Sequence, residues 1–345
     1  MNHFNSNRRQ FNLALAALAG SALLPGTARA ASSVVAAVFP GSWEDAYRRT
    51  LVPMLAKSGV ELIIAPMLAQ DQLAKAIAAG GKPAYDALLL SPGQTAEAVD
   101  RGLIEKIDTS KLANWNKLDD KLKSPWGPTV TVEVNGIAYN PELVPRPKGY
   151  KDLFTNPAYD GKVAWLGFGS NSATMAWVEI ARLYGGGEDN MQPVFDLLRK
   201  HLPKIGAIAN SGNAQMALFQ QREIGVFMAS TNNVSRLKTM GVPCEFVHPE
   251  SGSPAVPVNI HLTKGAANPA AVYAYMDAAI SAAAQNQLKM PPVEQIPTNR
   301  DVAFTPSLEA FVTREQMAKF IYQDWVKINK NRAAWTAEFD RIVKK

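Results

Sequence analysis

Three short turns carry the side chains that are best suited to binding a ligand. They are Ser91–Thr95, Gly169–Thr174 and Ser230–Asn233, and each follows an apolar run and precedes a helical pattern. The N-terminus of a helix carries partial positive charge and unpaired N–H donors, so it favours anionic groups. Ser, Thr and Asn also serve as ordinary helix N-caps, which is the simpler explanation for any single turn.

Three such turns at one cleft predict a neutral site that is rich in hydrogen-bond donors. Such a site suits a carboxylate, a phosphonate or a zwitterion, and Glu44 could meet an ammonium group on the same solute. Trp43, beside it, could line the cleft or pack in the core. The candidate ligand-binding residues on the turns are Ser91, Gln94, Ser170, Asn171, Ser172, Thr174, Ser230, Thr231 and Asn232.

The sequence lacks the patterns that usually mark catalysis or a cofactor. It has no G-x-S-x-G motif, and its histidines lie without a matching set of Ser and Asp. The four histidines and the lone Cys244 do not have the spacing of zinc ligands. Gly167–Ser172 nearly matches a dinucleotide-binding motif, but Ser172 replaces its third glycine. We therefore expect no cofactor, no metal and no enzymatic activity.

Alternating strand and helix patterns must position these turns. This alternation predicts a parallel sheet wrapped by helices, and such sheets bind ligands beyond the carboxyl ends of their strands. Ser42 is expected to cap the first helix, with Asp45 completing a capping box. In the first unit we expect strands over 33–39, 60–65 and 85–90, and helices from 42, over 70–79 and from about 95 to 101.

A long β-rich stretch at 129–140 is predicted to pass from one lobe to another. Beyond it we expect strands over 162–166, 223–228 and 256–262, helices over 173–184 and 269–284, and mostly amphipathic helix over 308–343. With 345 residues the chain exceeds the size of one hydrophobic core, so two lobes are expected. We assign 31–133 with about 260–300 to lobe 1, about 134–259 to lobe 2, and about 301–345 to C-terminal helices that pack on the lobes.

Residues 1–30 have the composition of a cleaved export signal. They contain three arginines and no acid, followed by an apolar stretch to Leu24, a Pro-Gly break and small residues at the end. Asn7–Phe11 resembles a twin-arginine (Tat) signal, although Asn12 stands where leucine is usual, so Sec export remains open. The alternative is that this segment forms the first helix of the fold. The export signal predicts a periplasmic protein.

Charge and cysteine content exclude two further classes of protein. The formal charge of the chain is +6, and removal of the three leader arginines lowers it to +3. A charge this small, without runs of Lys or Arg, does not indicate a basic surface that would bind nucleic acid. A single cysteine excludes an internal disulfide framework, and a bridge-free protein with one cysteine tolerates an oxidising compartment.

Several segments occur in an order that is specific when they are taken together. Tyr85–Ser91 (YDALLLS) is followed by Arg101–Asp108 (RGLIEKID) and then by Val134–Asn140 (VNGIAYN). This order resembles the periplasmic solute-binding proteins of ABC importers, in the branch of the spermidine/putrescine receptors, over about residues 34–343. The resemblance implies a type II periplasmic binding fold, in which two α/β lobes with mainly parallel sheets are joined by crossing strands.

The resemblance also implies what the protein does and with which partners. Members close on a small solute without catalysis and pass it to an inner-membrane permease that a separate ATPase drives. We expect a monomer that binds no nucleic acid. An exported hydrolase or other enzyme on a two-lobed α/β frame is the alternative, and a receptor that serves a chemosensor or a non-ABC carrier is a third possibility.

The cation cage of the polyamine receptors is largely missing from this sequence. Those receptors surround an alkyl diammonium with aromatic rings and carboxylates. Trp43 and Glu44 match the first such position, but Ser91–Gln94 replaces tyrosines and Ser170–Thr174 replaces paired acids. Asn259 lies where a later Trp and Asp pair is usual, which makes it a further candidate. We therefore expect the cleft to prefer a carboxylate, a phosphonate or a zwitterion over a polyamine.

Overall fold

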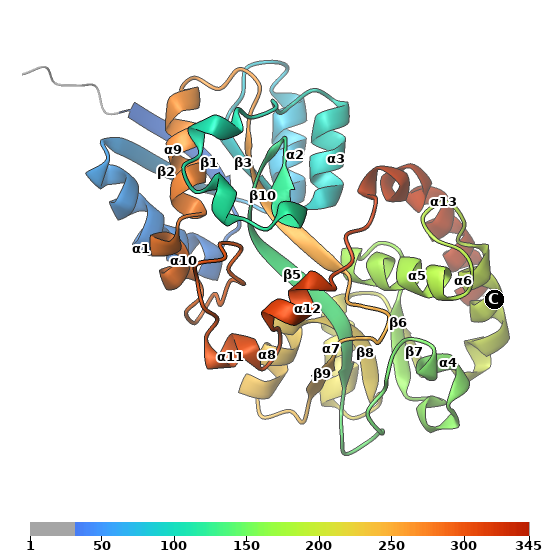
Figure 1. Ribbon diagram of the computed structural model, residues 1–345. Coiled ribbons are helices and arrows are strands. Elements are labelled where there is room, and N and C mark those ends of the chain that lie inside the picture. The colour runs from blue at the N-terminus through green and yellow to red at the C-terminus, as the bar shows by residue number, and fades with distance from the viewer. Residues whose placement is uncertain (1–31, 345) are drawn as a thin grey trace, which may run out of the picture.

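In the computed structural model, which describes residues 32–344, the first third of the chain alternates strand and helix as predicted (Figure 1). Its elements are β1 (Ser32–Val38), α1 (Ser42–Lys57), β2 (Val60–Pro66), α2 (Ala69–Ala78), β3 (Ala87–Leu90) and α3 (Pro92–Asp100). The three strands are parallel, with β1 in the middle. Val34 and Ala36 pack toward α1 whereas Ala37 packs toward α2, so β1 is buried on both faces, as parallel sheets require.

A strand from much later in the chain completes the sheet of lobe 1. β10 (Ala255–Leu262) runs antiparallel between β3 and β5 (Gly127–Tyr139), and the short β4 (Lys123–Ser124) pairs with the start of β5. α9 (Pro269–Ala279) and α10 (Ala282–Leu288) pack in the same hydrophobic cluster as α1. Lobe 1 is therefore built from two separate stretches of chain.

The middle of the chain forms lobe 2 around a second group of strands. β6 (Val163–Leu166) lies between β7 (Ala207–Ala209) and β8 (Val226–Ser230) and is parallel to both. β5 pairs with β8 and with β9 (Glu245–Val247) and is antiparallel to both. The helices of this lobe are α4 (Asp152–Thr155), α5 (Asn171–Leu183), α6 (Gln192–His201), α7 (Gly212–Gln220) and α8 (Thr231–Thr239).

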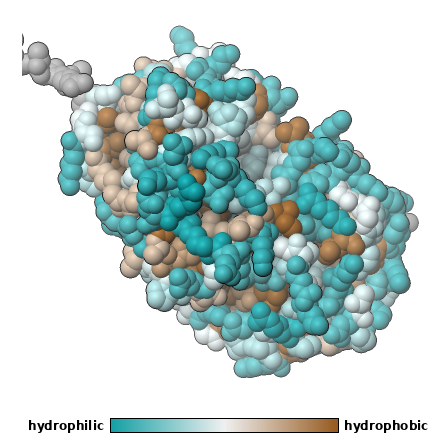
Figure 2. All heavy atoms as spheres, in the orientation of Figure 1, coloured by the Kyte–Doolittle hydropathy of each residue, from teal (hydrophilic) through white to brown (hydrophobic). Residues whose placement is uncertain are grey.

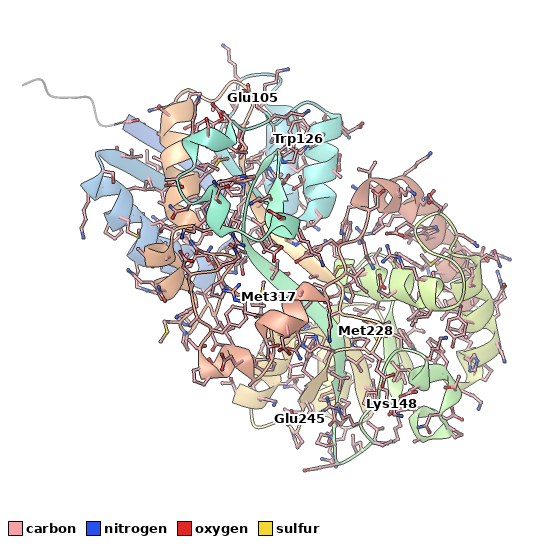
Figure 3. The ribbon with its side chains drawn as sticks, in the orientation of Figure 1. Glu105, Trp126, Lys148, Met228, Glu245 and Met317 are labelled. Atoms are coloured by element: carbon pink, nitrogen blue, oxygen red, sulfur yellow. The ribbon has the colours of Figure 1, made fainter. Side chains whose placement is uncertain are left out.

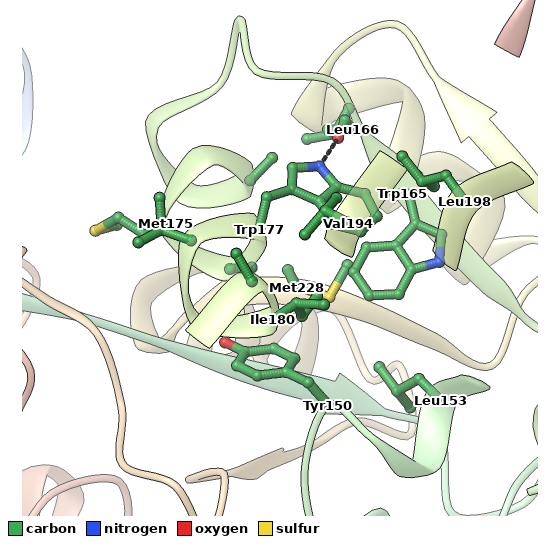
Figure 4. Packing of buried hydrophobic residues seen from close by; sticks show 14 of the residues in the cluster. Tyr150, Leu153, Trp165, Leu166, Met175, Trp177, Ile180, Val194, Leu198 and Met228 are labelled. Atoms are coloured by element: carbon green, nitrogen blue, oxygen red, sulfur yellow. Dashed lines mark hydrogen bonds between the residues drawn. The ribbon is translucent and has the colours of Figure 1, made fainter. Parts of the chain in front are cut away.

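Stacked aromatic side chains fill the core of lobe 2 (Figure 4). The rings of Trp165 and Trp177 stack with their centroids 4.3 Å apart, and Phe154 stacks on Trp165 at 5.1 Å. The indole N–H of Trp177 donates to the carbonyl of Leu166 at 2.8 Å. The polar end of this buried indole is therefore satisfied inside the core.

Three segments of chain join the lobes. Residues 129–134 of β5 pair with β10, and residues 135–139 of the same strand pair with β8 in lobe 2. β10 makes the return crossing. The third segment runs beside its start, where Ile321 exchanges backbone hydrogen bonds with Ser253 and Ala255 at 3.0 Å each. The prediction of two α/β lobes joined by crossing strands is confirmed.

The C-terminal part is less regular than predicted. α11 (Pro306–Glu309) and α12 (Arg314–Ala318) are short, and they cluster with Val132 and Val134 of the crossing strand β5. Met317 of α12 lies over this strand (Figure 3). Only α13 (Trp325–Val343) is a long helix, so the prediction of mostly amphipathic helix over 308–343 is right for its second half alone.

Two predicted helix boundaries are wrong. Ser42 is the first residue of α1, because Gly41 takes the N-cap position and no side chain caps the helix. The helix predicted over 269–284 ends at Ala279, and Ser281 caps α10 by accepting a hydrogen bond from the N–H of Ala284 at 3.2 Å. The Ala-rich composition favours one continuous helix, but Ser281 caps a second helix and so divides it into two.

The export signal and its Tat-like motif lie outside the described residues. None of the helices within 32–344 is both long and apolar enough to cross a membrane. One face of the molecule is mainly hydrophilic, with small and separate hydrophobic areas (Figure 2).

Candidate functional site

A crevice lies where lobe 1, lobe 2 and the crossing strand β5 meet. Its cavity volume is about 30 Å³, so the crevice is narrow in this structure. Trp43 lines it from lobe 1, Thr231 and Asn232 line it from lobe 2, and Glu133 lines it from β5. The full lining consists of Trp43, Thr131, Val132, Glu133, Thr231, Asn232, Ser235, Val293, Glu294, Gln295, Ile296, Leu308, Phe311 and Val312.

Glu133 is the acidic residue on the crossing strand. It lies in a strand whose other residues are buried, and no charged or hydrogen-bonding group of the described chain is paired with its carboxylate. Burial raises the pKa of the Glu133 carboxyl because the charged form is poorly solvated there. A carboxylate in such a place gains stability when a cation reaches it.

Glu294 and Gln295 line the same crevice from the segment that follows α10. Gln295 is only 5% exposed, and neither its amide nitrogen nor its amide oxygen makes a hydrogen bond of good geometry within the described residues, although the buried hydroxyl of Tyr47 lies close to it. An unpaired buried polar group costs about 1–3 kcal/mol. A ligand that reached the Gln295 amide would relieve this cost.

The crevice as a whole is acidic. Its lining includes two carboxylates and no Lys, Arg or His. This crevice therefore differs from the neutral cleft that the sequence predicts. The difference arises because Glu133 and Glu294 come from segments that the three polar turns do not include.

The turn before α8 both caps a helix and lines the crevice. The hydroxyl of Ser230 accepts a hydrogen bond from the N–H of Asn233 at 3.3 Å, so Ser230 is the N-cap of α8. Thr231 and Asn232 follow it and line the crevice. The structure thus brings these two predicted residues together with Trp43.

The turn before α5 is held mainly by its own hydrogen bonds. Ser170 caps the helix by accepting from the N–H of Ala173 at 3.4 Å. The buried hydroxyl of Thr174 donates to the carbonyls of Phe168 and Ser170, at 2.9 and 2.8 Å. These contacts give Ser170 and Thr174 structural roles.

Ser172 links this turn to the crossing strand. Its hydroxyl donates to the side-chain oxygen of Asn135. Asn135 lies two residues after Glu133, so both side chains are on the same face of β5. Ser172 is therefore near the crevice without lining it, and Asn171 beside it is half-buried.

The turn before α3 lies outside the crevice. Ser91 takes the N-cap position of α3 but makes no side-chain capping bond, and the amide oxygen of Gln94 is buried without a described partner. Asn259 donates to the carbonyl of Gly127 at 3.0 Å and to the hydroxyl of Thr129 at 3.1 Å. Asn259 borders a second hollow of about 350 Å³, which lies between α3 and α13.

A buried histidine holds the first turn of α3. The hydroxyl of Thr95 and Nε2 of His261 are 2.9 Å apart, and Nδ1 of His261 is 2.8 Å from the carbonyl of Trp126. A neutral ring satisfies both contacts when Nδ1–H donates to the carbonyl and Nε2 accepts from Thr95. Burial lowers the pKa of His261 to about 4, so this neutral form holds at ordinary pH.

Trp43 and Glu44 have different roles although they are adjacent. The ring of Trp43 packs on Phe39 and Tyr47, with centroids 5.1 and 5.9 Å apart, and it also lines the crevice. Both interpretations of Trp43 are therefore correct. Glu44 pairs with Arg48 at 2.8 Å and does not line the crevice.

The sequence held one signal for the acidic crevice. Glu133 is a half-buried charged residue within a mainly apolar and β-branched strand, and Glu seldom occupies such a position unless it has a partner. Glu294 and Gln295 follow Pro291-Pro292 in a stretch without a periodic pattern, so nothing local indicated their position.

The side chains of the crevice are suited to binding and not to covalent chemistry. Its polar groups are hydroxyls, amides and carboxylates, and no histidine or cysteine lies beside a hydroxyl to activate it. Among residues 32–344, no group of three His, Cys, Asp or Glu side chains could hold a metal ion.

Comparison with known proteins gives a consistent result. Residues 55–316 match the family described as bacterial extracellular solute-binding protein. The spermidine/putrescine-binding periplasmic protein of Escherichia coli (strain K12) is 25% identical over 272 residues, which are 72% of this chain and 76% of that protein.

Two solved structures have the same fold. An ABC transporter protein from Clostridium perfringens superposes with a TM-score of 0.81 at 22% identity, over 90% of this chain and 99% of that one. The AttC binding protein of Agrobacterium tumefaciens, in an open unliganded conformation, superposes with a TM-score of 0.75 at 16% identity, over 90% and 99% of the two chains.

Proposed function

The chain belongs to the bacterial extracellular solute-binding proteins, and from this premise we propose that it carries a small amine-bearing solute, bound beside Glu133, to an ABC importer. The observation that carries this proposal is the unpaired carboxylate of Glu133 in a crevice without a basic residue. A cationic nitrogen is the partner that such a carboxylate lacks.

The solute would be enclosed by both lobes. Trp43 comes from lobe 1, Thr231 and Asn232 come from lobe 2, and Glu133 comes from the strand that joins them. A solute that touches all three parts stabilises the closed arrangement over the open one, because these contacts are lost when the lobes separate. AttC, which shares the fold, has been observed open and without ligand.

The expected solute carries one or more amines, and a zwitterion fits as well as a diamine. Glu133 and Glu294 would meet the cationic end. The N-terminus of α8, with Thr231 and Asn232, would meet a carboxylate, a phosphonate or a hydroxyl at the other end. The Escherichia coli relative binds spermidine and putrescine, which agrees with an amine.

We favour transport over catalysis because the crevice lacks a nucleophile with a base beside it. The partners would be an inner-membrane permease and its ATPase, with the receptor working as a monomer in the periplasm. The leader at 1–30, read as a Tat-like or Sec signal, would deliver it there.

Three probes of similar length test the proposal by isothermal titration. Putrescine carries two amines, 4-aminobutanoate carries one amine and one carboxylate, and glutarate carries two carboxylates. We expect putrescine or 4-aminobutanoate to bind and to raise the melting temperature, because a ligand of the native state stabilises it. Glutarate should do neither. Binding of glutarate alone, or conversion of a bound probe into product, would contradict the proposal.

A further inference from the structure

The C-terminal helix α13 is anchored in lobe 2. Trp335, Phe339 and Ile342 belong to the hydrophobic core of that lobe. The guanidinium of Arg332 donates to the carbonyls of Phe168 and Gly169 at 2.6 and 3.0 Å. The helix is therefore expected to move with lobe 2 whenever the two lobes move apart.

The chain just before α13 is fixed to lobe 2 as well. The side-chain amide of Gln323 donates to the carbonyl of Met175 and to the carboxylate of Glu179, both at 2.8 Å. The backbone N–H of Asp324 donates to Glu188 at 3.1 Å. The start of α13 is therefore also expected to move with lobe 2.

The first two turns of α13 nevertheless contact lobe 1. The side-chain amide of Asn329 donates to the carbonyl of Gly93 at 2.8 Å. Trp325 is only 4% exposed, and Ala96 of α3 packs on the cluster that contains it. Both contacts fall on the first residues of α3, which begins at Pro92 after the N-cap Ser91.

Glycine at position 93 is what allows this approach. A Cβ placed on Gly93 would lie 3.1 Å from Cε3 of Trp325 and 3.6 Å from the side-chain oxygen of Asn329. The first distance is tighter than ordinary van der Waals contact. The backbone of Gly93 is not left-handed, so close packing against the indole, and not φ, explains the residue.

We propose that Trp325 and Asn329 form a clasp that positions the Ser91–Thr95 turn and holds the two lobes together on the α3 side. The clasp moves with lobe 2 and grips lobe 1 at Gly93, so it separates when the lobes open. The side chain of Trp325 becomes more exposed to solvent at the same time. The clasp lies apart from the crevice around Glu133, so it acts whatever solute is bound.

Interlobe distances measured by double electron–electron resonance test this proposal without any ligand. Spin labels are attached at Lys57→Cys in lobe 1 and Lys200→Cys in lobe 2, both of which are exposed positions. The native Cys244 is buried. The variants are Asn329→Ala, which removes the hydrogen bond, and Gly93→Ala, which pushes a methyl group against the indole.

Asn331→Ala is the matched control. Its side-chain amide donates to the carbonyl of Glu188 at 3.0 Å, so this bond lies within lobe 2. We expect Asn329→Ala and Gly93→Ala to shift the distance distribution toward a more separated arrangement, and Asn331→Ala to match the parent. Solute affinity should fall about 3- to 10-fold in Asn329→Ala, since a lost hydrogen bond has an effect of this size, and it should also fall in Gly93→Ala, where the added methyl group pushes against the indole.

Two outcomes would overturn the clasp. One is a distance distribution in Asn329→Ala and Gly93→Ala that matches the parent, and the other is an equal shift in the Asn331→Ala control. Absence of solute binding by the parent would count against the proposed function, and the ligand-free distances would still decide the clasp.

Discussion

Glu133 and Val256 face each other across the two crossing strands, one residue pair before β5 exchanges its partner β10 for β8. The unpaired carboxylate therefore lies beside the point at which the chain passes from one lobe to the other. A solute that binds Glu133 contacts the joint between the lobes as well as their walls. In the proposed function, charge recognition and lobe closure would therefore be coupled in one place.

Replacement of Glu133 by Gln should weaken solute binding while it stabilises the empty protein. Loss of one partner from a buried charge pair costs about 2–5 kcal/mol, or roughly 30-fold or more in affinity. The raised pKa means that the folded state disfavours the ionised carboxyl, so above the ordinary pKa of Glu this group reduces stability. We therefore expect the Glu133→Gln variant to be more stable than the parent at pH 7.

Isothermal titration and urea unfolding measure these two effects. Glu44→Gln is the matched control, because its exposed pair with Arg48 contributes little to stability and does not line the crevice. Equal affinity of the Glu133→Gln variant and the parent would show that the solute binds elsewhere.

Trp43→Ala should reduce both affinity and stability, whereas Trp43→Phe should reduce affinity more than stability. The indole packs on Phe39 and Tyr47 as well as lining the crevice, so its removal leaves a gap in the edge of the core. Removal of a fully buried Trp costs about 3–5 kcal/mol, and this half-buried one should cost less. Titration and urea unfolding of both variants check this, and unchanged affinity in both would remove Trp43 from the site.

Stability should fall as the pH is lowered from 7 to 4, and His261 should account for part of the slope. Its pKa is about 4 in the folded protein and near 6.5 when unfolded, so between these values the unfolded chain binds more protons. The contribution is present above pH 6.5 and is lost as the pH falls toward 4, by about 3 kcal/mol. Urea unfolding of His261→Gln at pH 7 and pH 5 should show a smaller difference than the parent. An equal difference in the two proteins would contradict this assignment.

Trp177→Phe should destabilise lobe 2 without changing solute affinity. The variant loses the stacking area on Trp165 and leaves the carbonyl of Leu166 without its donor. We expect a loss of about 2–3 kcal/mol in urea unfolding. Affinity measured under native conditions should remain within about twofold of the parent, because the side chain is remote from the crevice lining. A large change in affinity would show that the core of lobe 2 shapes the site.

Much of the fold could be predicted from the sequence because its strands are rich in apolar residues. Mainly apolar segments such as 60–65 and 85–90 end at turns with Pro or Ser, and the long β-rich stretch at 129–140 marks the crossing strand. The region 190–222 was harder, because β7 has only three residues and its flanking helices are short. The helix predicted over 308–343 is interrupted for a related reason. The short helices α11 and α12 pack on β5, and local sequence patterns do not reveal this packing.

The candidate site was less predictable because its parts come from distant segments. Local patterns located Trp43, Thr231 and Asn232, which follow strands, as binding residues of such folds do. Capping explains Ser170 and Ser230, and only coordinates separate that role from ligand binding. Glu294 and Gln295 reach the crevice because their segment crosses over from α10, which no periodicity reveals.

The position of β10 between β3 and β5 sets the order in which the molecule can be assembled. A growing chain that has completed β3 still has one unpaired sheet edge, since the strand that covers it arrives more than 150 residues later. Exposed edges of this kind invite pairing with other chains. The half of the protein that is synthesised first therefore waits for a strand from the later part of the chain, and a chaperone would protect the open edge of β3 in the interval.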